Sequence, residues 1–465
     1  MRLRLRLRGL RLCMRGGRPL MAEPGRASEP ATGLFAYRHE AEGETSRVHL
    51  RLEPDGQALL LVNANRAYHL NPTAAALAWF ALEGRSEPEA IAFLRHRYRV
   101  SPRTARADFS DVSAQVRDLV RPNSACPIHE LDFDVLPPLS QAPSAPYRMD
   151  LALTYRCNNG CAHCYNARPR SHPEIGAQEW MRILSRLWDV GVPHICFTGG
   201  EATLRDDLPE LVAHAESLGQ ITGLLTNGRR LADQDYLGRL VDAGLDHVQI
   251  TLESHGPEIH DRMVACRGAW RQTVAGLRNA LQSRLFVMTN TTLLAENAPF
   301  LGETLDFLAD CGVPTVGLNG LIRSGSGAVV GTGLPEAELT PLLELARERT
   351  ATSGQRLIWY TPTQYCHFDP VQMQLGVKAC TAAAYNMCVE PDGAVIPCQS
   401  YYQSIGNLLS DPWEAIWNHE LALWLRERRY VPPRCTDCAL LAECGGGCPL
   451  SLPSLQPTAV EPARD

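Results

Sequence analysis

Three cysteines lie close together in one short loop of the chain. Cys157, Cys161 and Cys164 follow an apolar run, residues 149–154, with the spacing Cys-x₃-Cys-x₂-Cys. Thiolates spaced this closely can bind one small inorganic core, as iron–sulfur clusters require. Three thiolates leave one iron of a four-iron cluster without a protein ligand, and a catalytic cluster needs such an open position. The alternatives are a zinc knuckle or cysteines that are simply buried in the core.

A second group of cysteines occupies the C-terminal part of the chain. Four of them follow the spacing Cys-x₂-Cys-x₅-Cys-x₃-Cys, and three successive glycines precede the last. Glycines allow the backbone to fold closely round a metal, which core packing does not require. A zinc ribbon is the structural alternative. The group consists of Cys380, Cys388 and Cys398, and then the block of Cys435, Cys438, Cys444 and Cys448.

A Gly-Gly-Glu motif begins 35 residues after Cys164. Gly199 and Gly200 let the backbone approach a ligand closely, and Glu201 adds a hydrogen-bond acceptor. Taken alone, the tripeptide indicates a turn. Its position at the end of an expected strand, downstream of the cysteine loop, indicates a ligand site.

Short β-like runs alternate with helical runs from residue 149 to about residue 350. Such alternation predicts a parallel sheet, and six strand–helix units form a partial (β/α)₆ barrel of the α/β class. Chemistry in parallel barrels gathers at the C-terminal ends of the strands, where these motifs fall. Strands are expected at 149–154, 194–198, 221–226, 246–251, 285–291 and 315–319, and helices at 177–190, 207–218, 232–243, 270–283 and 300–311.

These motifs together resemble the radical S-adenosylmethionine (SAM) enzymes. In that family the open iron of a 4Fe–4S cluster chelates the amino and carboxylate groups of SAM. Reductive cleavage then yields a 5′-deoxyadenosyl radical, which abstracts a substrate hydrogen atom. The resemblance implies that Cys157, Cys161 and Cys164 hold this cluster, and that an external donor of the flavodoxin or ferredoxin type supplies the electron.

The same resemblance implies further SAM contacts. Gly199, Gly200 and Glu201 match the motif for the methionine ammonium group. Tyr165 is expected to be a further cofactor-binding residue. Glu253 and Ser254 belong to a stretch that corresponds to one reaching the SAM ribose, and Asn290 is a second candidate there, although each of these three could merely satisfy a strand end. Loop packing is favoured over function for His255, His260 and Arg262, and Arg323-Ser324-Gly325 either faces SAM or is a solvated loop.

The C-terminal cysteines resemble the SPASM extension of radical SAM enzymes, which carries two auxiliary 4Fe–4S clusters. The resemblance assigns Cys380, Cys388, Cys398 and Cys448 to the first cluster, and Cys435, Cys438 and Cys444 to the second. The family usually adds a cysteine after the block, but none follows Cys448. The second cluster therefore keeps an open iron that could bind a substrate thiolate, is closed by Cys366 or a non-cysteine ligand, or is absent. SAM and two or three 4Fe–4S clusters are the expected cofactors.

A winged-helix-like domain is predicted upstream of the barrel, over residues 47–120. Two strands flank Pro54-Asp55-Gly56, and Asn71 is an N-cap before Pro72. A winged helix alone indicates DNA binding, but acidic residues follow the arginines at 95–106, so a solvated surface is favoured. The strands are expected at 48–52 and 58–62, and the helices at 72–82, 88–97 and 104–120.

Residues 65–71 and the alanine-rich helix after them resemble the precursor-peptide recognition domain of ribosomal-peptide maturation systems. A member of this family is the small chaperone of pyrroloquinoline-quinone biosynthesis. In the family an exposed strand edge accepts the leader peptide as an added strand. The resemblance implies a precursor peptide as the partner, bound through its leader.

The remaining segments complete the expected organisation of the chain. Residues 1–46 are predicted to be a disordered basic N-terminus, either an anchor or an over-extended translation start before Met21. Cys13, Cys196, Cys266 and Cys311 are expected to be reduced core or tail thiols, and Cys126 is incidental. The expected ranges are 121–148 for a proline-rich linker, 149–350 for the barrel, 351–455 for the SPASM extension and 456–465 for a tail.

Composition narrows the classes of function. The net charge of −6 gives no argument for nucleic-acid binding. No apolar run approaches the roughly 20 residues of a membrane helix. Sixteen cysteines in short-spaced groups of a long chain favour metal ligation in a reducing cytoplasm over disulfides.

The sequence therefore predicts a cytoplasmic radical SAM/SPASM maturase that crosslinks or otherwise oxidises a ribosomal peptide. The first alternative is a SPASM enzyme for another substrate, in sulfatase formylglycine formation or haem-precursor modification. The second is a winged-helix regulator that uses its clusters as redox sensors. No catalytic acid stands out in the sequence.

Overall fold

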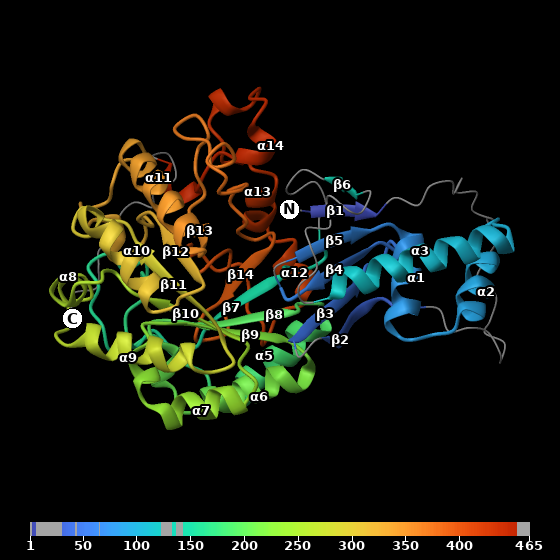
Figure 1. Ribbon diagram of the computed structural model, residues 1–465, viewed down its shortest axis with the longest axis horizontal. Coiled ribbons are helices and arrows are strands. Elements are labelled where there is room, and N and C mark those ends of the chain that lie inside the picture. The colour runs from blue at the N-terminus through green and yellow to red at the C-terminus, as the bar shows by residue number, and fades with distance from the viewer. Residues whose placement is uncertain are drawn as a thin grey trace. The chain divides into compact units, whose positions relative to one another are not determined.

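The chain divides into two compact units, Met1–Ser140 with Asp189–Pro193, and Gln141–Trp188 with His194–Asp465. Each unit has its own sheet (Figure 1). The computed structural model describes residues 2–5, 30–41, 44–64, 66–121, 133–135 and 143–452. Cys13, Cys126, Asn65, most of the expected linker and the 456–465 tail lie outside these residues.

The N-terminal unit combines a six-stranded sheet, in the order β2-β3-β4-β5-β1-β6, with three helices. Val48, Leu50, Leu60 and Tyr68 of the sheet share a buried core with Trp79 of the first helix. The strands are β1 Arg2–Leu5, β2 Gly33–Ala41, β3 Glu44–Leu52, β4 Ala58–Val62, β5 Arg66–Leu70 and β6 Phe133–Val135, and the helices are α1 Pro72–Leu82, α2 Glu87–Arg97 and α3 Pro102–Val120.

Local chemistry at the helix starts explains these bounds. The Asn71 side chain accepts hydrogen bonds from the backbone N–H groups of Thr73 and Ala74, at 3.1 and 2.9 Å, and caps α1 as predicted. Helix α3 begins two residues earlier than expected. Ser101 caps it by accepting from the Thr104 N–H at 3.1 Å, and Pro102 takes the first helical position.

The expected disorder of residues 1–46 is wrong for residues 33–41. They form β2, which pairs antiparallel with β3 from Gly33↔Leu52 to Ala41↔Glu44. Phe35 and Tyr37 pack against the buried core of the unit, and this tertiary contact is invisible in a short sequence window. Residues 2–5 also form a strand, β1, which runs parallel to β5.

The family resemblance implied an exposed strand edge in this unit, but neither outer strand of the β3–β4–β5 group has a free edge. Strand β3 pairs with β2 on its outer side, and β5 pairs with β1 on its outer side. Strand β6 then pairs with β1. Within the described residues, β2 and β6 are thus the outermost strands.

The second unit has a nine-stranded sheet in the order β13-β12-β11-β10-β9-β8-β7-β14-β15. All neighbours pair in parallel except β14 and β15, which are antiparallel. The bounds are β7 Arg148–Ala152, β8 His194–Thr198, β9 Ile221–Thr226, β10 His247–Thr251, β11 Phe286–Thr292, β12 Thr315–Asn319, β13 Arg356–Trp359, β14 Asn386–Val389 and β15 Val395–Ile396.

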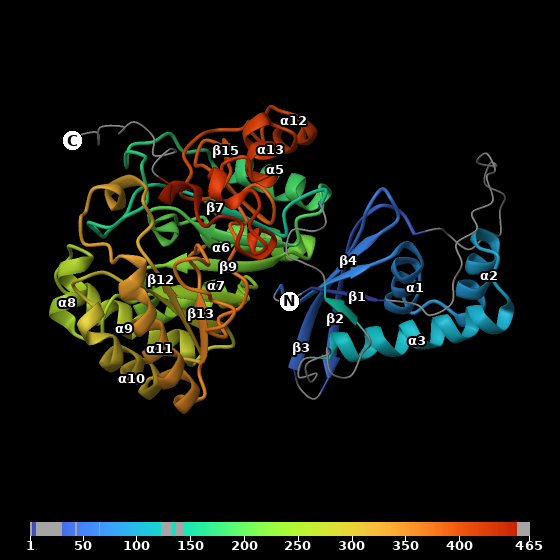
Figure 2. The same ribbon diagram turned by 90° about the horizontal axis from the view of Figure 1, so that it is seen from above.

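Helices follow the outer side of this curved sheet (Figures 1 and 2). The expected α/β barrel is confirmed. The sequence did not predict α8, α11 or the strand β13 that follows α11. The helices are α5 Ala177–Asp189, α6 Leu208–Leu218, α7 Gln234–Asp242, α8 Pro257–Met263, α9 Ala269–Leu281, α10 Leu301–Asp310, α11 Glu336–Ser353, α12 Trp413–Trp417, α13 Glu420–Arg426 and α14 Leu441–Cys444.

Interactions across the inside of the sheet show how strongly it curves. Arg148 on β7 interacts electrostatically with Tyr360, which directly follows β13, although five strands separate β7 from β13 in the sheet. The register places Cys196, Gly223 and His247 in one row across β8, β9 and β10. Gly223 is needed there, because a Cβ atom would lie 2.2 Å from the His247 ring nitrogen Nε2.

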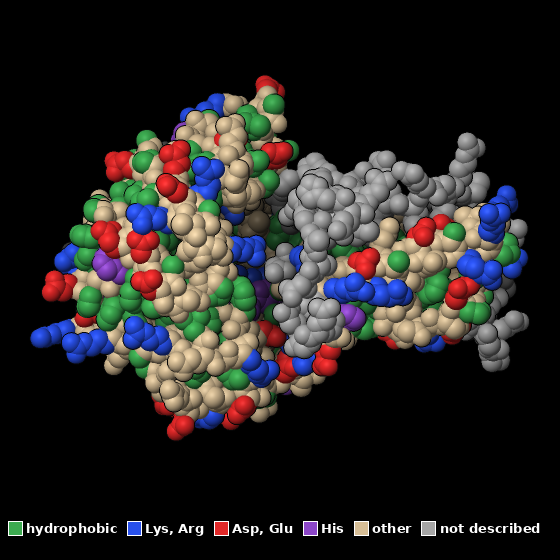
Figure 3. Space-filling view, viewed as in Figure 1, with side chains coloured by type: hydrophobic (Ala, Val, Ile, Leu, Met, Phe, Trp, Pro, Cys, Tyr) green, Lys and Arg blue, Asp and Glu red, His purple; other side chains and the backbone are tan. Residues whose placement is uncertain are grey.

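The outer surface of the second unit carries mixed charge. On the face shown in Figure 3, Lys and Arg side chains are interspersed with Asp and Glu. Among the described helices, none is both long and apolar enough to cross a membrane.

His247 predicts a specific pH dependence of stability. Burial, assisted by Arg148, lowers the pKa of His247 to about 4. As pH falls below the ordinary histidine value of about 6.5, the unfolded chain binds a proton that the folded chain does not, which costs up to about 1.4 kcal/mol per pH unit. We expect His247→Gln to lose less stability than the wild type between about pH 7 and about pH 5, measured by anaerobic urea unfolding. Equal losses in both proteins would contradict the prediction.

Candidate cluster and cofactor site

The cysteine loop follows β7, and two arginine side chains hold its backbone. One of them follows the loop in the sequence, and the other comes from the segment after β9. Arg170 donates from Nη1 to the Cys157 carbonyl at 2.8 Å and from Nη2 to the Asn159 carbonyl. Arg229 donates to the Asn158 carbonyl at 2.5 Å and to the Asn159 side-chain oxygen at 2.8 Å. The backbone of the loop is therefore fixed by side chains of the protein itself.

Loops at the C-terminal ends of other strands add further contacts. The Asn227 amide, after β9, donates to Asn158 Oδ1 at 2.7 Å. Gly160 N–H donates to the Val264 carbonyl at 2.8 Å, and Gly327 N–H donates to the Cys164 carbonyl at 3.0 Å. The site thus lies at the end of the barrel where parallel-barrel chemistry is expected.

The three thiols of the loop share one environment. Burial raises the pKa of Cys157 to about 11 and raises the pKa values of Cys161 and Cys164, and the charge of Cys164 raises those of Cys157 and Cys161 further. Buried thiolates therefore require a compensating cation. Among the described residues, no three His, Cys, Asp or Glu side chains converge on a single metal ion. A 4Fe–4S cluster does not need such convergence, since each cysteine binds a different iron, so the donor set fits a cluster.

The Gly-Gly-Glu motif packs directly against the strand that leads into the cysteine loop. Gly200 N–H donates to the Thr154 carbonyl at 2.7 Å, and Glu201 N–H donates to the Arg156 carbonyl at 2.9 Å. A Cβ atom at Gly199 would lie 2.1 Å from the Thr154 oxygen, and one at Gly200 would lie 2.4 Å from the Arg156 oxygen. Only glycine allows this approach.

The Glu201 side chain is engaged within the protein. It is 1% exposed, and its carboxylate accepts from the Thr203 hydroxyl at 2.6 Å, the Thr226 hydroxyl at 2.7 Å and the Asn227 N–H at 2.8 Å. Asn227 in turn holds Asn158 of the cysteine loop. The carboxylate therefore ties the ends of β8 and β9 to the loop.

Glu253 has a partner that the sequence did not indicate. Its Oε1 lies 3.0 Å from His163 Nε2, and its Oε2 accepts from the Thr292 N–H at 2.9 Å. Burial lowers the pKa of His163, but the Glu253 carboxylate outweighs this effect and leaves it raised. His260 Nδ1 accepts from the Glu253 N–H at 3.1 Å, so His260 packs in this layer, as expected.

Asn290 carries a buried polar atom that fits an absent ligand. Its Oδ1 is buried and has no hydrogen-bond partner within the described residues. Its carbonyl accepts from the Leu252 N–H at 3.0 Å, which places it beside the Glu253–Ser254 stretch. Ser254 is fully buried, and its hydroxyl oxygen accepts from the Gly256 N–H at 3.2 Å.

Tyr165 and the segment after β12 connect the cysteine loop with the C-terminal cysteines. The Tyr165 hydroxyl donates to the Gln399 side chain at 3.0 Å, next to Cys398. The Ser324 hydroxyl donates to the Ser400 carbonyl at 2.8 Å. Gly325 has a φ of 52°, and a Cβ atom there would lie 2.3 Å from the Asn166 carbonyl oxygen. The 323–325 segment therefore packs against the loop.

The four cysteines assigned to the first auxiliary cluster form a connected electrostatic group. Burial raises the pKa of Cys380, and the charges of Cys448 and Cys398 raise it further. Burial raises the pKa of Cys398 to about 12, with a further contribution from Cys448. Cys388 is fully buried, and Asp150 and Cys398 raise its pKa beyond the effect of burial.

The three cysteines assigned to the second cluster follow one another on short helical turns. Cys438 N–H donates to the Cys435 carbonyl at 3.1 Å, and Cys444 ends α14. The three glycines that follow have φ values of 65°, 80° and 81°, in the left-handed region. The chain can therefore turn tightly between Cys444 and Cys448, as the glycines predicted.

One ion pair and one strand pairing join the barrel to the C-terminal extension, and neither is apparent in the sequence. Arg168 donates to both oxygens of Glu390, at 2.7 and 2.8 Å, and the Tyr155 hydroxyl donates to Glu390 at 3.1 Å. Asp150, 1% exposed, pairs in register with Cys388 and accepts from Arg148 at 2.6 Å. Separations of up to 235 residues explain why no motif could reveal these contacts.

Sequence comparisons agree with this geometry. Residues 151–308 match the model of the Radical SAM superfamily, and residues 380–439 match that of SPASM, an iron–sulfur cluster-binding domain. The chain is 30% identical over 318 residues to the PqqA peptide cyclase of Bradyrhizobium diazoefficiens, a match that covers 65% of this chain and 81% of that protein. The chain belongs to the radical SAM superfamily.

The predicted enzyme class and cofactors, SAM and iron–sulfur clusters, are thereby confirmed. The radical SAM enzyme is also 28% identical over 325 residues to the Fe-coproporphyrin III synthase of Methanosarcina barkeri, covering 63% of this chain and 81% of that protein. The structure of Streptococcus suis SuiB bound to its precursor peptide SuiA shares the fold. It matches with a TM-score of 0.64 and 17% identity over 86% of this chain and 93% of SuiB.

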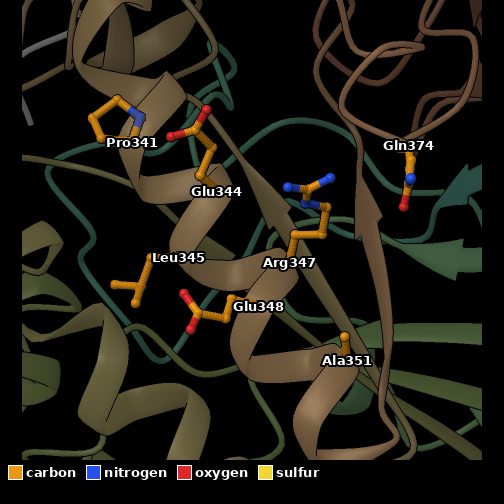
Figure 4. Close-up of a pocket in the computed structure, with 7 residues that line it drawn as sticks. All are labelled: Pro341, Glu344, Leu345, Arg347, Glu348, Ala351 and Gln374. Atoms are coloured by element: carbon orange, nitrogen blue, oxygen red, sulfur yellow. The ribbon is translucent and has the colours of Figure 1, made fainter.

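A hollow of about 640 Å³ lies elsewhere, along α11 (Figure 4). In that view Arg347 extends from the helix toward Gln374, and Glu344 and Glu348 come from the same helix. None of the predicted site residues lines the hollow. It therefore contributes nothing to the cofactor site.

Gly200 provides a direct test of the backbone contact beside the cysteine loop. In Gly200→Ala the new Cβ would meet the backbone carbonyls of Arg156 and Tyr155 at 2.4 and 2.5 Å, so the strand ends must move apart. We expect SAM cleavage to fall at least about tenfold, which corresponds to about 1.4 kcal/mol. The measurement is 5′-deoxyadenosine formation with dithionite. Gly302→Ala is the matched control, since its Cβ would meet no atom closer than 4.0 Å. Wild-type cleavage by Gly200→Ala would contradict the prediction.

Proposed function

We propose that this radical SAM enzyme oxidatively modifies a ribosomally made precursor peptide, forming a crosslink within it. One observation carries the proposal: a SAM-dependent barrel and SPASM domain share a chain with a separate unit of antiparallel strands and three helices. A unit of this kind presents strand edges for peptide binding, and the chemistry of the barrel does not require it.

The relatives support this substrate class. The name of the PqqA peptide cyclase states a peptide substrate, and SuiB was solved with its precursor peptide. The match to SuiB covers 86% of the chain. It cannot be confined to residues 143–452, which make up about two thirds of the chain, so it extends into the N-terminal unit. The likeness at 17% identity concerns the fold, and the substrate class is our inference from it.

The described residues suit distinct parts of the cofactor site. Cys157, Cys161 and Cys164 would hold the cluster that binds SAM, and bound SAM supplies the radical that removes a hydrogen atom from the peptide. The Gly199–Gly200 backbone would meet the methionine group of SAM, while Asn290 Oδ1 would accept a hydrogen bond from the ribose. Tyr165, Glu253 and Ser254 would shape the pocket around it. Glu201 acts as a positioning residue through Asn227.

The arginines and the C-terminal cysteines complete this assignment. Arg170 and Arg229 place positive charge beside the cysteine loop, which favours thiolates there. The groups Cys380/Cys388/Cys398/Cys448 and Cys435/Cys438/Cys444 would hold auxiliary clusters. Net oxidation of a peptide requires an electron acceptor, and these clusters meet that need. The initial electron comes from an external flavodoxin- or ferredoxin-type donor.

The leader of the peptide would be recognised at the outer side of β5. Two segments far apart in the sequence, β1 and β6, already extend the sheet on that side. The backbone of β5 can therefore pair with extended segments that differ in sequence, because strand pairing uses backbone groups. A leader would take the place of β1 beside β5.

The similarity to Fe-coproporphyrin III synthase supports a second candidate, modification of a haem precursor. The match covers 63% of this chain and the match to the PqqA peptide cyclase covers 65%, so coverage does not separate the two candidates. A porphyrin substrate has no backbone that could pair with a strand. We therefore favour the peptide.

The proposed function can be tested with candidate precursor peptides, taken from short open reading frames near the gene. The protein is reconstituted anaerobically, and SAM, dithionite and the peptide are added. We expect 5′-deoxyadenosine and a peptide lighter by the mass of two hydrogen atoms. Both products should be lost in a Cys157→Ala/Cys161→Ala/Cys164→Ala variant. Turnover of a porphyrin with an unchanged peptide would favour the second candidate.

Strand β1 gives a separate prediction about leader binding. A chain that starts at Met21 lacks β1 and should bind the leader at least as tightly as the full chain, because the outer side of β5 then has one competitor fewer. Fluorescence anisotropy of a labelled leader measures this affinity. Weaker binding by the shorter chain would instead make β1 part of the leader site.

A further inference from the structure

A segment upstream of the first auxiliary cysteines lies against the second cysteine block. The Tyr365 N–H donates to Cys444 Sγ at 3.4 Å, and the Cys444 thiol donates to the Thr363 carbonyl at 3.6 Å. Covalent geometry then limits the distance from Cys444 Sγ to the Cα atom of the next residue, Cys366, to at most about 9 Å. A fourth thiol therefore lies close to a block that has only three for its cluster.

Further contacts fix this segment on both sides of the block. Gln364 Nε2 donates to the Gly446 carbonyl at 3.1 Å, and Arg434 Nη2 donates to Gln364 Oε1 at 3.0 Å. Gly447 also requires the absence of a side chain, since a Cβ atom there would lie 2.9 Å from Gln364 Cγ. Arg434 directly precedes Cys435. The segment thus contacts residues at the beginning and at the end of the block.

We infer that Cys366 is the fourth protein ligand of the second auxiliary cluster, together with Cys435, Cys438 and Cys444. The inference rests on the cluster assignment in the proposed function. On ligation the Cys366 thiol releases its proton to water, and its thiolate forms one Fe–S bond to the iron that the other three leave open. No electron is transferred in this step.

The distribution of the other cysteines supports this choice. Cys448 interacts with Cys380 and Cys398 and so belongs to the first group. Cys196 is fully buried in the barrel, and Cys311 follows the last residue of α10. Cys366 and Cys438 are exposed, so iron can reach both during assembly.

The charge around the block also suits a site that gathers thiolates. Arg428 Nη2 donates to the Ala442 carbonyl at 3.1 Å, within α14, and Arg434 approaches from the other end. These guanidinium groups would offset part of the negative charge that four thiolates bring to a cluster. A cluster with four protein ligands has no open iron, so a substrate thiol would not bind at this position.

The experiment uses a full-length parent in which Cys157, Cys161 and Cys164 are replaced by Ala, which removes the cluster with the open SAM-binding iron. After reconstitution and removal of all added thiol reagents, the parent should hold about eight irons. Its reduced electron paramagnetic resonance spectrum should not change when 2-mercaptoethanol is added. Cys366→Ala in this parent should either lose about four irons or keep them with a spectrum that 2-mercaptoethanol alters.

Two further variants make the result specific. Cys311→Ala, which removes a thiol outside both groups, should behave like the parent. Cys366→Ser, whose hydroxyl is a weaker ligand of similar size, should retain more iron than Cys366→Ala, with a shifted spectrum. Circular dichroism of each variant checks that the fold is intact.

Several outcomes would overturn the inference. They are a parent spectrum that already responds to 2-mercaptoethanol, a parent that holds about four irons, and a Cys366→Ala variant indistinguishable from Cys311→Ala. The proposed function fails separately, if the wild type forms no modified peptide while the iron and spectral results stand.

Discussion

The close backbone contact between residues 154–156 and the Gly-Gly-Glu turn is the constraint on which the rest of the site depends. Hydrogen bonds of 2.7 and 2.9 Å join the ends of β7 and β8 there, and no side chain fits between them. The cysteine loop begins one residue later, so its starting direction is set by this contact. The buried Glu201 carboxylate extends the constraint to β9 and, through Asn227, back to Asn158. The hydrogen-bonded backbone thus fixes where the cysteine loop begins and where Asn158 lies.

Buried charge fixes the position of the C-terminal extension on the barrel. The Arg168–Glu390 pair, with Tyr155, and the Tyr165–Gln399 hydrogen bond connect residues on either side of the cysteine loop to residues beside Cys388 and Cys398. A buried ion pair adds little net stability, because desolvation offsets the attraction. Its effect is on specificity, since any other docking would leave a charge unpaired. The same contacts therefore set the distance between the cysteine loop and the cysteines Cys388 and Cys398.

Much of the fold and the core of the candidate site followed from the sequence, because these features are local. Strands, helices, the Asn71 cap and the cysteine spacings are each encoded within a few residues. The missed features are non-local. Strand β2 owes its place to contacts of Phe35 and Tyr37 with a core built later in the chain, and β13 pairs with β12 across the long helix α11. His163 gave no signal for Glu253, 90 residues away, because pairing across a barrel depends on register and not on spacing.

Cys366 illustrates the same difference for a metal ligand. A family pattern places the last ligand of the second cluster after the block, because patterns are read in chain order. A cluster is indifferent to chain order and requires only that four thiolates reach its irons. The hydrogen bonds of Thr363, Gln364 and Tyr365 to the block hold the segment that leads into Cys366 beside the block. Folding already brings these two segments together, so the entropic cost of closing the chain between them does not fall on ligation by Cys366.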